Sequence, residues 1–94
     1  MVALNVKHRV KDYSNWKKVY DQIAGLRKQS GVTGASVSQD VNDPNLIYVT
    51  HEFRDFNAAK AFADSEGLKQ AMAKAGVEGR PELWFTNEIE STPN

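Results

Sequence analysis

The sequence contains no cysteine and no excess of charge of either sign. Without cysteine there can be no disulfide bond, no thiolate nucleophile and no thiolate metal ligand, a composition that suits a reducing compartment. Lysine plus arginine and aspartate plus glutamate both total 12 among 94 residues. A chain without a positive excess gains little from a phosphate backbone, so we expect no nucleic-acid partner.

Long apolar runs are also missing from the chain. No segment approaches the roughly 20 apolar residues that cross a bilayer, so we expect no membrane-spanning helix. The opening residues, MVALNVKHRV, lack the basic-then-apolar order of a signal peptide, and we expect a cytoplasmic location. A phosphate-binding loop is not expected either, because the Gly31–Gly34 segment leads into a predicted strand.

Hydrophobic periodicity predicts six elements in the order strand, helix, strand, strand, helix, strand. Alternating apolar residues predict strands at 2–10, 32–41, 46–53 and 82–89. Apolar spacings of three and four predict a helix between residues 12 and 31 and another between 57 and 76. Asp12 or Ser14 can cap the first helix, while Asn57 and Ser65 are expected to cap two halves of an interrupted second helix. Residues 1–90 form one predicted domain, and 91–94 a frayed tail.

This order is the βαββαβ plan of a ferredoxin-like α+β fold. Two right-handed crossovers place both helices on one face of a four-stranded antiparallel sheet, with strand order 4-1-3-2. The opposite face would expose Tyr48 and Trp84 among balanced charges, which suits a second copy of the chain better than water. We therefore predict a homodimer that packs the two open sheet faces together.

Both histidines of the chain, His8 and His51, fall on the helix-covered face of the two central strands. Imidazole, with a pKa near 6.5, is the side chain best suited to proton transfer at neutral pH. If Val6 lies opposite Val49, the histidines are about 13 Å apart along the strands, and another register would bring them closer. The alternative is that each is a strand histidine held by one hydrogen bond. Metal binding is not expected, because neither has an acidic partner on this face.

Other residues on the helix-covered face would complete a pocket for a small molecule. Trp16 and Tyr20 lie four residues apart on one helical face, where a flat aromatic ligand could stack, although such a stripe is also typical of core. Asn87 is predicted on the inner face of the last strand. A buried amide without partners costs about 1–3 kcal/mol, so it would bind a ligand oxygen or tie down a loop. Further predicted lining residues, which could equally be core, are Phe53, Phe62, Met72 and Phe85.

The run YVTHEF at 48–53, followed by an amphipathic helix and the motif Ser65-x-x-Leu68-Lys69, resembles the antibiotic biosynthesis monooxygenase group of dimeric α+β barrels. The matching positions are His51-Glu52, the helix at 57–64, Ser65 and Lys69. As a fold plan the resemblance extends over nearly the whole chain. Proteins with this plan include cofactor-free quinone-forming oxygenases, haem-degrading enzymes, lactone isomerases and polyketide cyclases.

Two positions separate the chain from the haem-degrading branch of that group. The branch carries tryptophan where His51 stands and a histidine ligand where Met72 stands, so the resemblance implies a site without haem, and we expect no cofactor. The quinone-forming oxygenases hold tryptophan, tyrosine, asparagine and histidine side chains around a closed pocket. This chain can supply the same set from Trp16, Tyr20, Asn87, His8 and His51.

The resulting hypothesis is a cofactor-independent monooxygenase, or a cyclase or isomerase, that acts on a small aromatic or polyketide-like molecule between sheet and helices. His51 would be the general base or oxyanion partner, and His8 and Asn87 would orient substrate oxygens. The ring would be enclosed by Trp16, Tyr20 and Phe62. The alternative is a non-catalytic dimeric module that binds a small ligand or only assembles, with both histidines structural.

Overall fold

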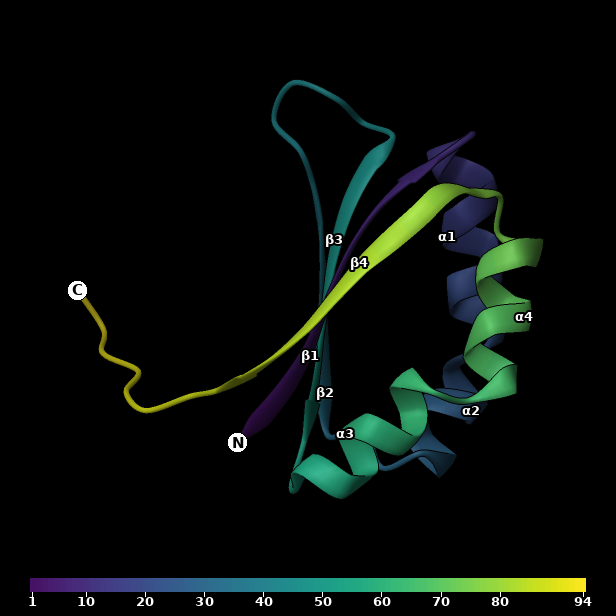
Figure 1. The fold of residues 1–94 in the computed structure, drawn as a ribbon. Helices are drawn as coiled ribbons and strands as arrows, with labels where there is room; N and C mark the ends of the chain where they lie inside the picture. The colour runs from purple at the N-terminus through teal and green to yellow at the C-terminus, as the bar shows by residue number, and fades with distance from the viewer.

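Four strands form one antiparallel sheet in the computed structural model, which describes all residues from Met1 to Asn94 (Figure 1). Their order is β2-β3-β1-β4, with bounds β1 Val2–Val10, β2 Gly34–Gln39, β3 Leu46–Phe53 and β4 Val77–Asn87. The prediction of a ferredoxin-like βαββαβ fold with β1 and β3 in the centre is confirmed. No helix of the structure combines the length and the apolar character that crossing a bilayer requires.

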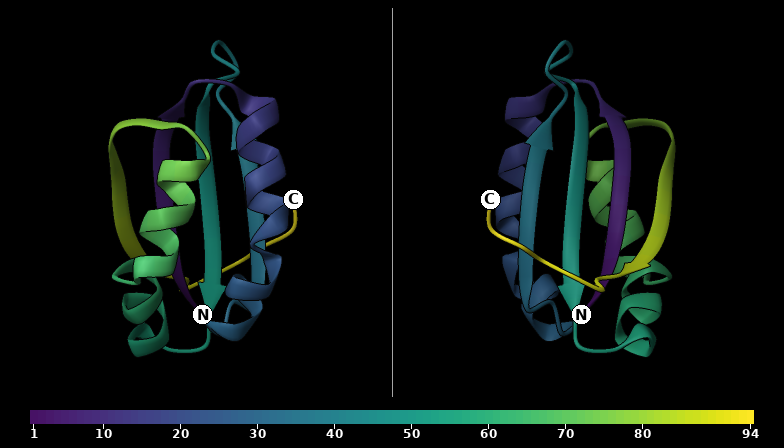
Figure 2. Two further views of the ribbon diagram at one scale, coloured as in Figure 1. Left: turned by 90° about the vertical axis from the view of Figure 1, so that its right-hand side faces the viewer. Right: turned by 90° about the vertical axis from the view of Figure 1, so that its left-hand side faces the viewer.

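Each of the two predicted helices is divided into two. The first is interrupted at Ile23, between α1 (Tyr13–Gln22) and α2 (Ala24–Gln29). The second is interrupted before the cap residue Ser65, between α3 (Phe56–Ala63) and α4 (Glu66–Lys74). All four helices lie on one face of the sheet, as two columns side by side, and the opposite face carries none (Figure 2).

Side-chain caps explain where three of these helices begin. Asp12 caps α1 and Ser65 caps α4, as the sequence predicts. The predicted cap at Asn57 is wrong, because α3 begins before that residue. Asp55 is the cap instead, and its carboxylate accepts a hydrogen bond from the backbone N–H of Ala58 at 2.8 Å. An aspartate cap satisfies one of the amides that the first turn of a helix leaves free.

The two edge strands differ from their predicted bounds. β2 is shorter than predicted and leaves Val41 96% exposed beyond its end. β4 begins at Val77, five residues before its predicted start at 82, and ends before Ile89, which is 94% exposed. The earlier start requires a shift of register opposite β1, and Gly79 supplies it with a φ of 70°. A left-handed glycine at such a shift is a common form of β-bulge.

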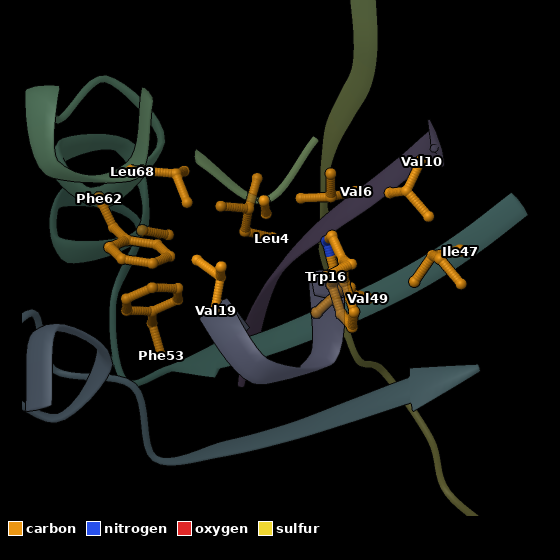
Figure 3. Packing of buried hydrophobic residues seen from close by; sticks show 12 residues of the cluster. Leu4, Val6, Val10, Trp16, Val19, Ile47, Val49, Phe53, Phe62 and Leu68 are labelled. Atoms are coloured by element: carbon orange, nitrogen blue, oxygen red, sulfur yellow. The ribbon is translucent and has the colours of Figure 1, made fainter. Parts of the chain in front are cut away.

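The register of the central strands places Val6 opposite Val49, His8 opposite Ile47 and His51 opposite Leu4. Alternate residues of both strands therefore face the helices and are buried. Side chains from α1, α3 and α4 close the core over them, as Figure 3 shows for Trp16, Val19, Phe62 and Leu68. The fold thus brings both histidines under the helical layer.

Candidate functional site

A cavity of about 40 Å³ lies between the covered face of the sheet and helices α1, α3 and α4. Eleven of its 13 lining residues are hydrophobic, and the two polar ones are the histidines. The structure brings six predicted site residues together here: His8, Trp16, Tyr20, His51, Phe62 and Met72. The other lining residues were not predicted, because apolar residues at these positions are typical of an ordinary core: Val6, Val19, Ile23, Val49, Leu68, Ala71 and Ala75.

Three predicted site residues do not line this cavity. Asn87 pairs with Val2 at the end of β4 and is exposed, so the prediction of a buried amide that orients substrate is corrected. β4 is an edge strand whose residues are mostly exposed, so the amide bears no desolvation cost. Phe53 is fully buried and packs on Phe62 with ring centroids 5.8 Å apart, which makes it a core residue. Phe85 packs edge-on against Phe56 instead.

The imidazoles of His8 and His51 are buried without hydrogen-bond partners. Their exposed fractions are 6% and 4%, and none of the four ring nitrogens has a partner within the protein. The pKa of both is lowered from 6.5 to about 4, by burial in each case and, to a smaller extent for His51, by the charge of Arg27. At neutral pH each ring is therefore uncharged and offers one N–H donor and one acceptor nitrogen. The alternative, that one hydrogen bond within the protein holds each histidine, is not found.

Aromatic rings connect the two histidines across the roof of the cavity. The centroid of His8 is 5.7 Å from that of Trp16, and Trp16 stacks on Tyr20 at 5.0 Å with an interplanar angle of 17°. Tyr20 lies 6.2 Å from His51, which meets Phe62 edge-on at 5.3 Å. These separations are those of offset-stacked and edge-to-face pairs. A flat molecule that entered the cavity would meet ring faces, ring edges and two neutral imidazoles.

The opening of the cavity lies between α1 and α4. Tyr20, Ile23 and Met72 are half-buried, whereas all other lining residues are buried. Arg27 of α2 stacks on Tyr20, with its Cζ 3.7 Å from the ring centroid, and donates a hydrogen bond to the backbone carbonyl of Tyr20. No sequence pattern assigned Arg27 a role, because a charged residue near a predicted helix end is typical of a solvated surface.

The family model for antibiotic biosynthesis monooxygenases matches residues 5–74. The chain belongs to the antibiotic biosynthesis monooxygenase family. The resemblance of the YVTHEF strand and the helix after it is thereby confirmed, and the match contains every residue that lines the cavity of this monooxygenase-family protein except Ala75. No curated protein matches the chain.

Solved structures with the same fold include several members of the family. A proposed antibiotic biosynthesis monooxygenase from Bordetella bronchiseptica has a TM-score of 0.81 at 9% identity, over 95% of this chain and 97% of that one. SnoaB, a cofactor-independent oxygenase from Streptomyces nogalater, has a TM-score of 0.80 at 12% identity, over 99% and 97%. A proposed family member from Deinococcus radiodurans has a TM-score of 0.77 at 17% identity, over 100% and 98%. At these identities the similarity shows the fold alone.

The two buried histidines of this family member make its stability depend on pH. Their pKa is about 4 in the folded chain and 6.5 in the unfolded chain, so between these values the unfolded chain binds more protons. The stabilisation is complete above pH 6.5 and falls as the pH drops toward 4. We expect the free energy of unfolding in urea to be lower at pH 5 than at pH 7, by roughly 1–2 kcal/mol for each histidine.

The matched controls for this pH dependence are His8→Phe, His51→Phe and the double variant. Each single variant should lose about half of the dependence, and the double variant should retain only what the carboxylates contribute. A wild-type urea midpoint that is the same at pH 7 and pH 5 would contradict the buried, neutral state of the rings.

Proposed function

We propose that this protein is a cofactor-independent monooxygenase, or a cyclase or isomerase, that acts on a small aromatic or polyketide-like molecule bound between sheet and helices. The observation that carries the proposal is the pair of neutral imidazoles without partners that face one apolar cavity. Membership of the family supports oxygenase chemistry. SnoaB, a cofactor-independent oxygenase, shares the fold.

His51 is the proposed general base. Its ring contacts Tyr20 and Phe62 and is uncharged at neutral pH, so one nitrogen can accept a proton from an acidic C–H or O–H of the substrate. Burial alone makes this ring a weak base, but a substrate anion formed beside it stabilises the imidazolium and raises its pKa. His8, at the other end of the ring stack, is placed to hydrogen-bond a substrate oxygen.

Oxygenation in such a site follows from deprotonation of the substrate. Loss of a proton from a ring CH₂ to His51 leaves a carbanion, which transfers one electron to dioxygen. The resulting substrate radical and superoxide combine into a peroxide. The second proton then leaves the carbon, the O–O bond breaks, and the proton on His51 completes a water molecule. The sum is CH₂ plus O₂ giving C=O plus H₂O, which requires no outside reductant, and the apolar lining shields the anion from water.

The cavity must widen before such a substrate can enter. A volume of about 40 Å³ has room for dioxygen or a few water molecules, whereas drug-sized ligands occupy pockets of roughly 300 Å³ or more. The half-buried residues at the opening are the ones that can move, and Met72 is the most adaptable because its side chain is unbranched and flexible. The proposal therefore includes separation of α4 from α1 when the substrate binds.

Replacement of His51 by leucine tests the base. With anthrone or hydroxyquinone-type compounds and measured oxygen consumption, we expect kcat to fall by roughly 10²–10⁴-fold, because general-base catalysis contributes that much. The exposed Lys28→Gln variant is the control and should keep wild-type turnover. Wild-type kcat/KM should remain level from pH 7.5 down to about 5.5, since a free-enzyme pKa of about 4 places the acid limb lower. Unchanged turnover in His51→Leu refutes the assignment and leaves the non-catalytic binding module.

We also propose that the helix-free face of the sheet pairs with a second copy of the chain. This face carries Tyr48 and the 44% exposed Trp84. Between them runs a hydrogen-bonded row in which Thr50 donates to Asn5 and Asn5 donates to Thr86, both at 3.0 Å. A helix-free sheet face with a tryptophan and internally paired polar groups is better suited to another protein surface than to water.

Native mass spectrometry tests this homodimer. We expect a dimer at micromolar concentration and a monomer for Trp84→Glu, because the charge would be buried without a partner at the interface. Phe56→Glu is the matched control, since Phe56 is similarly exposed at 49% but lies on α3, on the other side of the sheet. A monomeric wild-type protein, or a Trp84→Glu variant that remains dimeric, would contradict the proposal.

A further inference from the structure

The guanidinium of Arg27 lies beside Tyr20, a half-buried residue of the cavity lining, without a carboxylate partner. It stacks on the ring of Tyr20 and uses one N–H on the backbone carbonyl of the same residue. An arginine has five such donors, so four remain free of protein acceptors. The ion pairs of the protein join other residues: Arg9 to Asp43, Lys17 to Asp21, and Lys60 to Asp64.

Local structure holds Arg27 in this position. α2 is a separate short helix without a side-chain cap, and it begins where α1 ends at Ile23. Leu26 packs α2 closely against Gly67 of α4. A Cβ added at Gly67 would lie only 3.2 Å from Cδ2 of Leu26. The guanidinium is therefore placed by packing on one side of α2 and by the Tyr20 stack on the other.

The cavity lining carries no charge that competes with Arg27. The lining residues are hydrophobic or neutral histidine. Lys17 and Asp21, the nearest charged residues on α1, neutralise one another through a 2.6 Å contact. A planar guanidinium with free donors is the side chain that best recognises an oxyanion, because its parallel N–H groups bind two lone pairs together.

We propose that Arg27 is the anion-binding residue of this site, and that it holds a phenolate oxygen of the substrate while the reacting carbon still carries the proton that His51 removes. The proposal rests on the proposed function, because it takes the cavity as the substrate site. The ring of Tyr20 contacts both Arg27, at 3.7 Å, and His51, at 6.2 Å. A molecule that reaches both groups therefore lies along Tyr20, with its oxyanion toward α2 and its reacting carbon toward His51.

This arrangement gives the two groups separate tasks. Arg27 stabilises the negative charge on the substrate oxygen, which makes the neighbouring carbon electron-rich. Together with burial, which has the larger effect, the same positive charge lowers the pKa of His51 and keeps its ring neutral before the substrate binds. A neutral ether of the same shape would fill the cavity equally well but would leave the guanidinium without an anion.

Comparing the affinity for an anion with the affinity for its neutral ether tests whether Arg27 recognises the negative charge. The probes are 2-hydroxy-1,4-naphthoquinone, an anion at neutral pH, and 2-methoxy-1,4-naphthoquinone. Affinity is read from quenching of Trp16 fluorescence in a Trp84→Phe background, where Trp16 is the one remaining tryptophan. We expect the anion to bind at least about tenfold more tightly than the ether, as a charge-assisted hydrogen bond provides.

Variants assign the preference to Arg27. Arg27→Gln should weaken binding of the anion about tenfold and leave binding of the ether unchanged, which also shows that the variant folds. Arg27→Lys should restore part of the preference, because it keeps the charge but not the planar fork. Lys28→Gln, one residue away, should change neither affinity.

Two outcomes would overturn the inference, and they are distinguishable. If wild type binds both probes equally, or if Arg27→Gln keeps the preference for the anion, the role of Arg27 is refuted while the cavity remains an aromatic site. If neither probe quenches Trp16, the cavity does not bind aromatic molecules, and the proposed function falls together with the role of Arg27.

Discussion

The pairing of Val6 with Val49 is the constraint on which the rest of the structure depends. Side chains alternate along a strand, so this register sets both histidines on the covered face of the sheet, in line with Leu4 and Ile47. If β3 slipped by one residue, its apolar face would turn to the open side of the sheet, and His51 would leave the cavity with it. The core and the candidate site are thus specified by the same pairing.

Burial of two imidazoles without partners opposes folding, and the apolar core must offset it. An unsatisfied buried polar group costs about 1–3 kcal/mol, whereas full burial of a large apolar side chain contributes roughly 1.5–3 kcal/mol. Leu4, Ile47 and Phe53 are fully buried beside the cavity and supply that compensation. Leucine at either histidine position would give a more stable core. A polar residue that interrupts the apolar face of a strand in this way is expected at a functional site.

Much of the fold could be predicted from the sequence, because alternation and helical spacing report which face of each element is apolar. The same patterns placed His8, His51, Trp16 and Tyr20 together. They failed where tertiary geometry decides: Asn87 lies on the covered face in register, but it belongs to an edge strand and is exposed. Arg27 could not be found either. The periodicity predicts one continuous helix there, whereas the chain breaks at Ile23 and Arg27 stacks on Tyr20 across that break.

The candidate site depends on two imidazoles that are uncharged and have no hydrogen-bond partner within the protein, in one apolar cavity. The most direct measurement is an NMR titration of the histidine ring nitrogens and carbons in the folded, ligand-free protein between pH 8 and pH 4.5. Both rings should keep the shifts of neutral imidazole down to about pH 5 and titrate only near 4. Titration of either ring near its ordinary pKa of 6.5 would show that it is solvated or paired, and would contradict the account.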